Sequence, residues 1–134
     1  MYPIILSTLL LTANASVIPD KVKLQNQNVV RMAAESLANE LPKKVDKFTS
    51  LVKITPKSEK LIYTFEINST KSDDALIKQD KTKMKKRIVS GICSSSKRFL
   101  DSDISIKYIY KSAKSKKEIL SLDVNKTLCD YPPE

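Results

Sequence analysis

The stretch LIYTFEIN, residues 61–68, decides the fold class of this chain. Apolar side chains stand at positions 61, 63, 65 and 67, and polar ones stand at positions 64, 66 and 68. Because successive side chains of a strand point to opposite faces, this alternation predicts a strand with one face in the core. Before it, Pro56-Lys57-Ser58-Glu59 predicts a turn. Residues 45–54 predict a partner strand, paired with the first in a hairpin, with one face formed by Phe48, Val52 and Ile54.

Helical spacing precedes the hairpin. In residues 25–41 the apolar positions follow the period of a helix, and Pro42 is expected to end it. The segment 16–24, with Pro19 in it, is expected to be a loose connection. The apolar stripe of this first helix is expected to pack in the core, and it comprises Val30, Ala33, Ala34, Leu37, Ala38 and Leu41.

A second helix and two more strands follow the hairpin. Ser72 or Asp73 is suited to cap a helix that extends to about Ile92. Alternation then predicts a third strand over residues 104–110 and a fourth over residues 119–124. The sequence therefore predicts an α+β fold of order α-β-β-α-β-β, with a four-stranded antiparallel sheet and helices on one face.

The first fifteen residues predict an export signal. Met1 to Thr12 is mainly apolar and is too short to span a bilayer, which needs about 20 apolar residues. Ala13-Asn14-Ala15 supplies the small-x-small pattern of a signal peptidase site, so we expect cleavage before Ser16 and a periplasmic or secreted protein. The alternative interpretation is a buried N-terminal strand or helix. Residues 16–134 are then expected to form a single domain.

Cys93 and Cys129 are the only cysteines. In an oxidising compartment an even number of cysteines predicts a disulfide, and two cysteines allow one intramolecular pairing. A metal site would need further ligands, and a catalytic thiol would need a neighbouring base. The chain has no histidine for either role, so we expect a structural disulfide and neither a metal nor a cofactor.

Composition favours a folded, basic domain. The 134 residues are 41% hydrophobic and 29% charged, which is close to the average for globular proteins. The formal net charge of +9 favours anionic partners, although a solvated lysine-rich surface has the same composition. Gly91 is the only glycine, which excludes a glycine-rich phosphate loop.

Two kinds of pattern could support catalysis. Ser94 and Lys97 match Ser-x-x-Lys, in which a desolvated lysine takes the serine proton, but the companion motifs of that hydrolase class are absent. Neighbouring carboxylates could act in pairs, as in glycosidases, but in predicted connections Asp more often caps a helix or makes a turn. These pairs are Asp73 with Asp74 and Asp101 with Asp103. We therefore expect a protein that is not an enzyme.

Basic side chains are densest between residues 78 and 98. The residues expected to bind an anionic partner are Lys78, Lys81, Lys85, Lys86, Arg87, Lys97 and Arg98. A second basic cluster, in the predicted turn after the third strand, comprises Lys111, Lys114, Lys116 and Lys117. Contacts with phosphate groups would make such binding salt-dependent, whereas the alternative is a solvated face. No aromatic side chains are interleaved with these lysines, so nucleic acid is not an expected partner.

Aromatic residues are concentrated on two predicted strands, and they are Tyr63, Phe65, Tyr108 and Tyr110. One interpretation is an aromatic ligand site across neighbouring strands. The other is packing in the core under the helices, which is the commoner role of such side chains.

Several short motifs carry a resemblance to a known group of proteins. They are Leu41-Pro42-Lys43-Lys44-Val45-Asp46, Leu61-Ile62-Tyr63-Thr64-Phe65, Ile92-Cys93, Tyr108-Ile109-Tyr110 and the final Cys129. Through them the chain resembles small uncharacterised periplasmic proteins of Gram-negative bacteria that have one disulfide. The resemblance implies export and a disulfide, and it supplies no catalytic residues. More distantly, the layout resembles that of pilotins, which chaperone an outer-membrane secretin subunit; many pilotins are lipoproteins, and no lipidation cysteine follows the apolar run here.

These features predict a non-enzymatic exported accessory or binding protein that docks an acidic or extended protein segment. Strand addition at an open sheet edge would supply backbone hydrogen bonds, and the basic helix would steer the partner. The alternative is an envelope-active effector or inhibitor that binds anionic glycan or lipid. Neither interpretation involves a cofactor, nucleic acid or a transmembrane segment.

Overall fold

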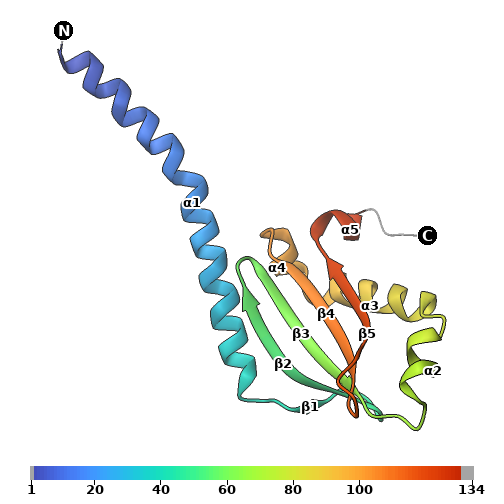
Figure 1. The fold of residues 1–134 in the computed structure, drawn as a ribbon. Coiled ribbons are helices and arrows are strands. Elements are labelled where there is room, and N and C mark those ends of the chain that lie inside the picture. Colours follow the sequence, from blue (N-terminus) through green and yellow to red (C-terminus); the bar gives the residue numbers. More distant parts are fainter. Residues whose placement is uncertain (1, 131–134) are drawn as a thin grey trace.

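A five-stranded mixed sheet lies at the centre of the fold (Figure 1). The computed structural model describes the backbone of residues 2–130 and the side chains of residues 20–130. In sheet order the strands are β1 (Lys43–Lys44), β2 (Thr49–Lys57), β3 (Lys60–Ile67), β4 (Ser105–Ser112) and β5 (Glu118–Val124). Within the described range the helices are α1 (Tyr2–Ala38), α2 (Asp73–Lys78), α3 (Thr82–Ser95), α4 (Lys97–Asp101) and α5 (Lys126–Asp130). The fold is therefore α+β, as the sequence predicts.

The sheet is mixed rather than antiparallel, which corrects the predicted topology. β3 and β4 run parallel, with Tyr63 opposite Tyr108 and Phe65 opposite Tyr110, whereas the other neighbouring strands are antiparallel. The reason is the connection, because α2, α3 and α4 carry the chain from the end of β3 back to the end at which β3 began. A crossover of this kind produces a parallel pair, whereas a hairpin turn produces an antiparallel one.

The first strands also differ from the prediction. A fifth strand, β1, pairs with Ser50 and Leu51 of β2, and its two residues are too few to show an alternating pattern. The register of β2 shifts between Leu51 and Lys53, so Leu51 and Ile54 face the core across Val52. Phe48, Val52 and Ile54 therefore do not share one face, and Phe48 is 47% exposed.

Both predicted helices have different limits in the structure. α1 includes the segment 16–24, which was expected to be loose, and it ends at Ala38 rather than Leu41. Extending an existing helix costs much less than nucleating one, and residues 20–25 contain good helix formers. The second predicted helix is two helices, because Asp80 accepts hydrogen bonds from the backbone and hydroxyl of Thr82 and starts a new helix there. As predicted, Ser72 caps the first of these, α2, through the backbone N–H of Ala75.

The predicted signal peptide lies mostly outside what the structure describes. The backbone of residues 2–15 belongs to α1, while the side chains of residues 1–19 lie outside the described set. The cleavage site before Ser16 stays a prediction. Among the described residues, no helix is long and apolar enough to cross a membrane.

The helices pack on one face of the sheet, as the sequence predicts. The main cluster joins Val30 and Ala34 of α1 and Ile92 of α3 to the sheet residues Leu61 and Ile106. A disulfide joins Cys93 of α3 to Cys129 of α5, which attaches the crossover helices to the end of β5. No helix within residues 2–130 covers the opposite face of the sheet, which carries residues such as Lys53, Lys57, Lys60 and Lys107.

Replacing Cys93 and Cys129 together by serine is expected to lower the free energy of unfolding by about 2–4 kcal/mol. The physical reason is that the bridge joins residues 36 positions apart and so restricts the unfolded chain. Urea denaturation of the variant and the oxidised wild type measures the difference. The matched control is the reduced wild type, which should unfold with the variant; an unchanged midpoint would show that packing alone holds α5 in place.

Candidate functional site

The helix-covered face contains a groove between α1 and the α3–α4 segment. It consists of two neighbouring hollows of about 280 and 410 Å³ that share Ser95 and Phe99 in their walls. We call them together the inter-helix groove. Its lining residues that carry the argument are Val29, Leu37, Leu41, Tyr63, Ser95, Phe99 and Tyr108.

The floor of the inter-helix groove is aromatic because of the parallel register. Tyr63 of β3 lies opposite Tyr108 of β4, and their ring centroids are 5.1 Å apart. Phe65 and Tyr110, two residues further along these strands, are buried, and their stacked rings have centroids 4.7 Å apart. The sequence allowed either core packing or a ligand site for these four residues. Phe65 and Tyr110 pack in the core, whereas Tyr63 and Tyr108 are half-buried and line the groove.

The walls of the groove combine apolar surface with a charged rim. Val29 of α1 is 44% exposed although it adjoins the groove, and Leu37 and Leu41 are only half-buried. Glu40, Lys43 and Arg98 stand among the lining residues and bring both signs of charge to the rim. A concave surface with an apolar floor and a few polar groups is typical of a binding site for apolar side chains of a ligand.

A buried polar contact holds one end of this groove. Asn26 of α1 is 7% exposed, and its side-chain amide donates to Glu59 Oε2 at 2.8 Å and to the carbonyl oxygen of Ser102 at 2.9 Å. These bonds connect α1 to the β2–β3 turn and to the loop before β4. The width of the groove is therefore set by named contacts as well as by apolar packing.

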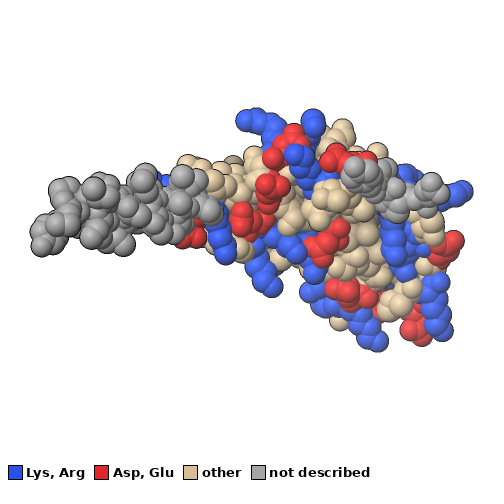
Figure 2. All heavy atoms as spheres, turned by 90° about the horizontal axis from the view of Figure 1, so that it is seen from above, with Lys and Arg blue, Asp and Glu red and all other residues tan. Residues whose placement is uncertain are grey.

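The predicted basic cluster lies on the outside of the crossover helices. Lys85, Lys86 and Arg87 are exposed on α3, and Lys78 is exposed on α2. Two members have intramolecular partners: Lys81 donates to the carbonyl oxygen of Ile77 at 2.6 Å, and Lys97 pairs with Asp101 at 3.3 Å, while Arg98 lines the groove. In the view of Figure 2, acidic side chains stand between separate groups of Lys and Arg. Anion binding by this cluster stays a prediction.

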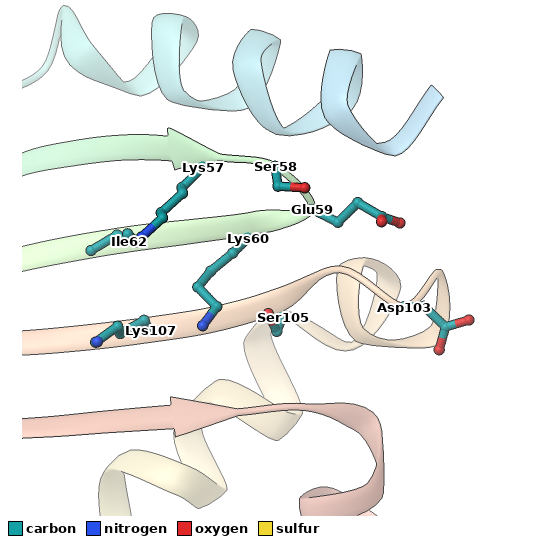
Figure 3. Close-up of a pocket in the computed structure, with 8 residues that line it drawn as sticks. All are labelled: Lys57, Ser58, Glu59, Lys60, Ile62, Asp103, Ser105 and Lys107. Atoms are coloured by element: carbon teal, nitrogen blue, oxygen red, sulfur yellow. The ribbon is translucent and has the colours of Figure 1, made fainter. Parts of the chain in front are cut away.

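A second group of lysines lies on the uncovered face of the sheet, where the sequence analysis placed no site. Lys57, Lys60 and Lys107 line a hollow of about 360 Å³ there (Figure 3). Lys57 and Lys60 flank the β2–β3 turn, whereas Lys107 joins them only through the pairing of β3 with β4. The sequence gives only a weak indication of this group, because each of the three lysines simply occupies a polar position in an alternating strand.

The candidate catalytic residues lie at exposed or helix-terminal positions in the structure. The side chain of Lys97 is 73% exposed and is paired with Asp101, whereas a lysine that removes a serine proton has to be desolvated. Asp73 and Asp74 lie in the first turn of α2, where carboxylates favour the helix dipole. Asp103 adopts a positive φ of 65° after α4, in a connection as expected. Among the described residues, no group of three potential metal ligands comes together.

The fold is similar to that of several solved structures of other small proteins. The pilotin EpsS of the Vibrio vulnificus type 2 secretion system superposes with a TM-score of 0.70 at 15% identity, covering 86% of this chain and 99% of that one. The type II secretion system pilotin AspS of Vibrio cholerae superposes with a TM-score of 0.64 at 17% identity, covering 81% of this chain and 95% of that one. A Pseudomonas aeruginosa protein inferred to be secreted superposes with a TM-score of 0.69 at 10% identity, covering 81% of this chain and 96% of that one. At these identities the similarity shows the shared fold.

The chain belongs to the family described as domain of unknown function DUF8479, whose model matches residues 24–121. The matched region contains β1 to β4, the first part of β5, and the residues that line the inter-helix groove and the hollow on the uncovered face. A comparison with curated protein sequences finds no match.

Raising the pH above 10 is expected to lower the free energy of unfolding. Burial raises the pKa of Tyr63 and of Tyr108 above the usual 10, and burial, with nearby Tyr108 and Asp46, raises the pKa of Tyr110 to about 12. The neutral tyrosines are thus favoured in the folded state, so this contribution is complete below pH 10 and is lost as the pH approaches about 12. Urea unfolding over this range measures it. Tyr110→Phe should reduce the dependence, and an equally steep loss in that variant would contradict the assignment.

Proposed function

We propose that this protein is a non-enzymatic exported accessory protein that docks an acidic or extended segment of a partner protein. The observation that supports the proposal is the inter-helix groove, with its floor of Tyr63 and Tyr108 and its apolar wall from α1. The pilotin fold is used by proteins of the type II secretion system in two Vibrio species. A periplasmic partner of secretin type is the corresponding hypothesis for this chain.

The chemistry of the groove favours a segment that presents apolar side chains. Tyr63 and Tyr108 expose part of each ring in the groove, and aromatic surface of this kind contributes strongly to interfaces. Burial of partner side chains against Leu37 and Leu41 would remove apolar surface from water, at about 25 cal/mol per Å² before the costs of association. The groove is therefore a better candidate than strand addition, which needs no such floor.

Charge would act mainly on the rate of encounter. The chain carries a net charge of +9, and Lys85, Lys86 and Arg87 are exposed on α3. Opposite charges at the edge of an interface increase the association rate more than they stabilise the complex. An acidic partner segment would be steered by this field and held by the apolar groove.

Site-specific crosslinking can test the groove directly. A photo-reactive amino acid at Ser95, which is exposed and lines both hollows, is expected to form an adduct with the partner in periplasm and envelope of the producing cells. The same group at Ser94 is the matched control, because Ser94 is also exposed and lines neither hollow. Mass spectrometry of the adduct identifies the protein.

With the photo-reactive amino acid moved to Val29, which also lines the groove, Ser95→Trp is expected to abolish capture because the indole would fill the middle of the groove, while Ser94→Trp should leave capture intact. Thermal unfolding of both variants checks that the fold survives. Equal capture through positions 94 and 95, or recovery of only glycan or lipid, would contradict docking in the groove. The second result would instead favour an envelope-active protein that binds anionic glycan or lipid.

Charge reversal tests the steering role separately. The combined variant Lys85→Glu, Lys86→Glu and Arg87→Glu is expected to lower the association rate with the identified partner by about tenfold at low salt. The dissociation rate should change little, because these side chains lie outside the groove. Surface plasmon resonance at several salt concentrations separates the two rates, and unchanged association at low salt would remove the α3 cluster from the mechanism.

A further inference from the structure

The uncovered face of the sheet concentrates positive charge at one end. Lys57 and Lys60 stand directly opposite each other in the register of β2 and β3, and Lys107 of β4 lies opposite Ile62, two residues along β3 from Lys60. Like charges placed directly across a sheet destabilise it. In Figure 3 the side chains of Lys57 and Lys60 extend from the hairpin turn toward Ile62 and Lys107.

The acidic groups around this hollow do not neutralise the three lysines. Asp123 of β5 pairs with Lys60 at 2.8 Å and with Lys107 at 3.9 Å, and within residues 20–130 no ion pair involves Lys57. Glu59 also lines the hollow, but its side chain points away and accepts the hydrogen bond from Asn26. Asp103 likewise points away from the lysines. Three ammonium groups and one facing carboxylate leave an excess of two positive charges.

The hollow also has the donors and the space that a phosphate group needs. Ser105 lies in its lining near the side chain of Lys60, so its hydroxyl group adds a donor to the three ammonium groups, whereas the Ser58 hydroxyl points away from the lysines (Figure 3). Its volume of about 360 Å³ falls within the usual range of small-molecule sites. A phosphate monoester carries between one and two negative charges at neutral pH and three strongly accepting oxygens, which match this excess charge and this number of donors.

We propose that Lys57, Lys60 and Lys107 form a binding site for the phosphate group of a phosphate monoester. The site is separate from the inter-helix groove, since it lies on the opposite face of the sheet. The phosphate displaces Lys60 and Lys107 partly from Asp123 and relieves the repulsion between Lys57 and Lys60. Both a phosphorylated headgroup of a lipid and a soluble phosphate ester offer this chemistry.

Two probes test the site on the full exported protein: inorganic phosphate, and phosphatidylcholine vesicles with and without phosphatidic acid. Phosphate is expected to shift the NMR signals of backbone amides around Lys60, Ser105 and Lys107. The variant Lys57→Gln, Lys60→Gln and Lys107→Gln should weaken binding by at least about tenfold, because it removes the charge-assisted hydrogen bonds. Binding of both probes supports a lipid headgroup, and binding of phosphate alone supports a soluble ester.

The matched control removes the same charge from the other side of the molecule through Lys83→Gln, Lys86→Gln and Arg87→Gln on α3. It should leave phosphate binding within about twofold of wild type, because these side chains lie far outside the hollow. Equal losses in both triple variants, or no binding of either probe, would overturn the proposal. Ser95→Trp should not affect phosphate binding, so the outcome is independent of the groove.

Discussion

The parallel pairing of β3 with β4 is the constraint on which the rest of the structure depends. It requires a crossover, and the chain between residues 67 and 105 supplies it as three helices on one face of the sheet. α1 packs on the same face, against β2 and β3, so the helices leave a groove between them. The disulfide between Cys93 and Cys129 secures this arrangement, because it connects α3 to the element that follows the last strand.

The same pairing gives the two faces of the sheet different properties. On the covered face the register places Tyr63 beside Tyr108, which forms the aromatic floor of the groove. On the uncovered face it brings Lys60 and Lys107 close enough to share Asp123. One face therefore offers apolar surface in a concave setting, and the other offers excess positive charge.

The neighbours in fold show that this backbone architecture recurs in proteins of very different sequence. Two of them are type II secretion system pilotins, and all three match over more than four fifths of this chain. Their low identity means that the backbone plan is shared, while the groove and the basic hollow belong to this chain's own side chains. The family of residues 24–121 spans both features, so the two surfaces can be compared among its members.

The α+β class, most strands and most of the apolar stripe of α1 could be predicted from the sequence, because each depends on the local period of side chains along a helix or strand; Ala38, predicted to be in that stripe, is exposed. The alternation of apolar and polar residues predicted β3, β4 and β5, with limits within two residues of those in the structure. Helical spacing predicted that Val30 and Ala34 lie in the core. The sequence also predicted the disulfide, since two cysteines allow one pairing. The break at Asp80 and the shift beside Val52 were missed, because a local hydrogen bond or a bulge overrides the period there.

Tertiary structure alone decided which strands are neighbours and in which direction they run. Residues 60 and 107 are far apart along the chain, and alternation predicts that each is polar but not that they meet. The inter-helix groove likewise depends on the distance between α1 and α4, which follows from packing and from the bonds of Asn26. Local periodicity records which face a side chain occupies, whereas contacts between distant segments decide what stands next to it.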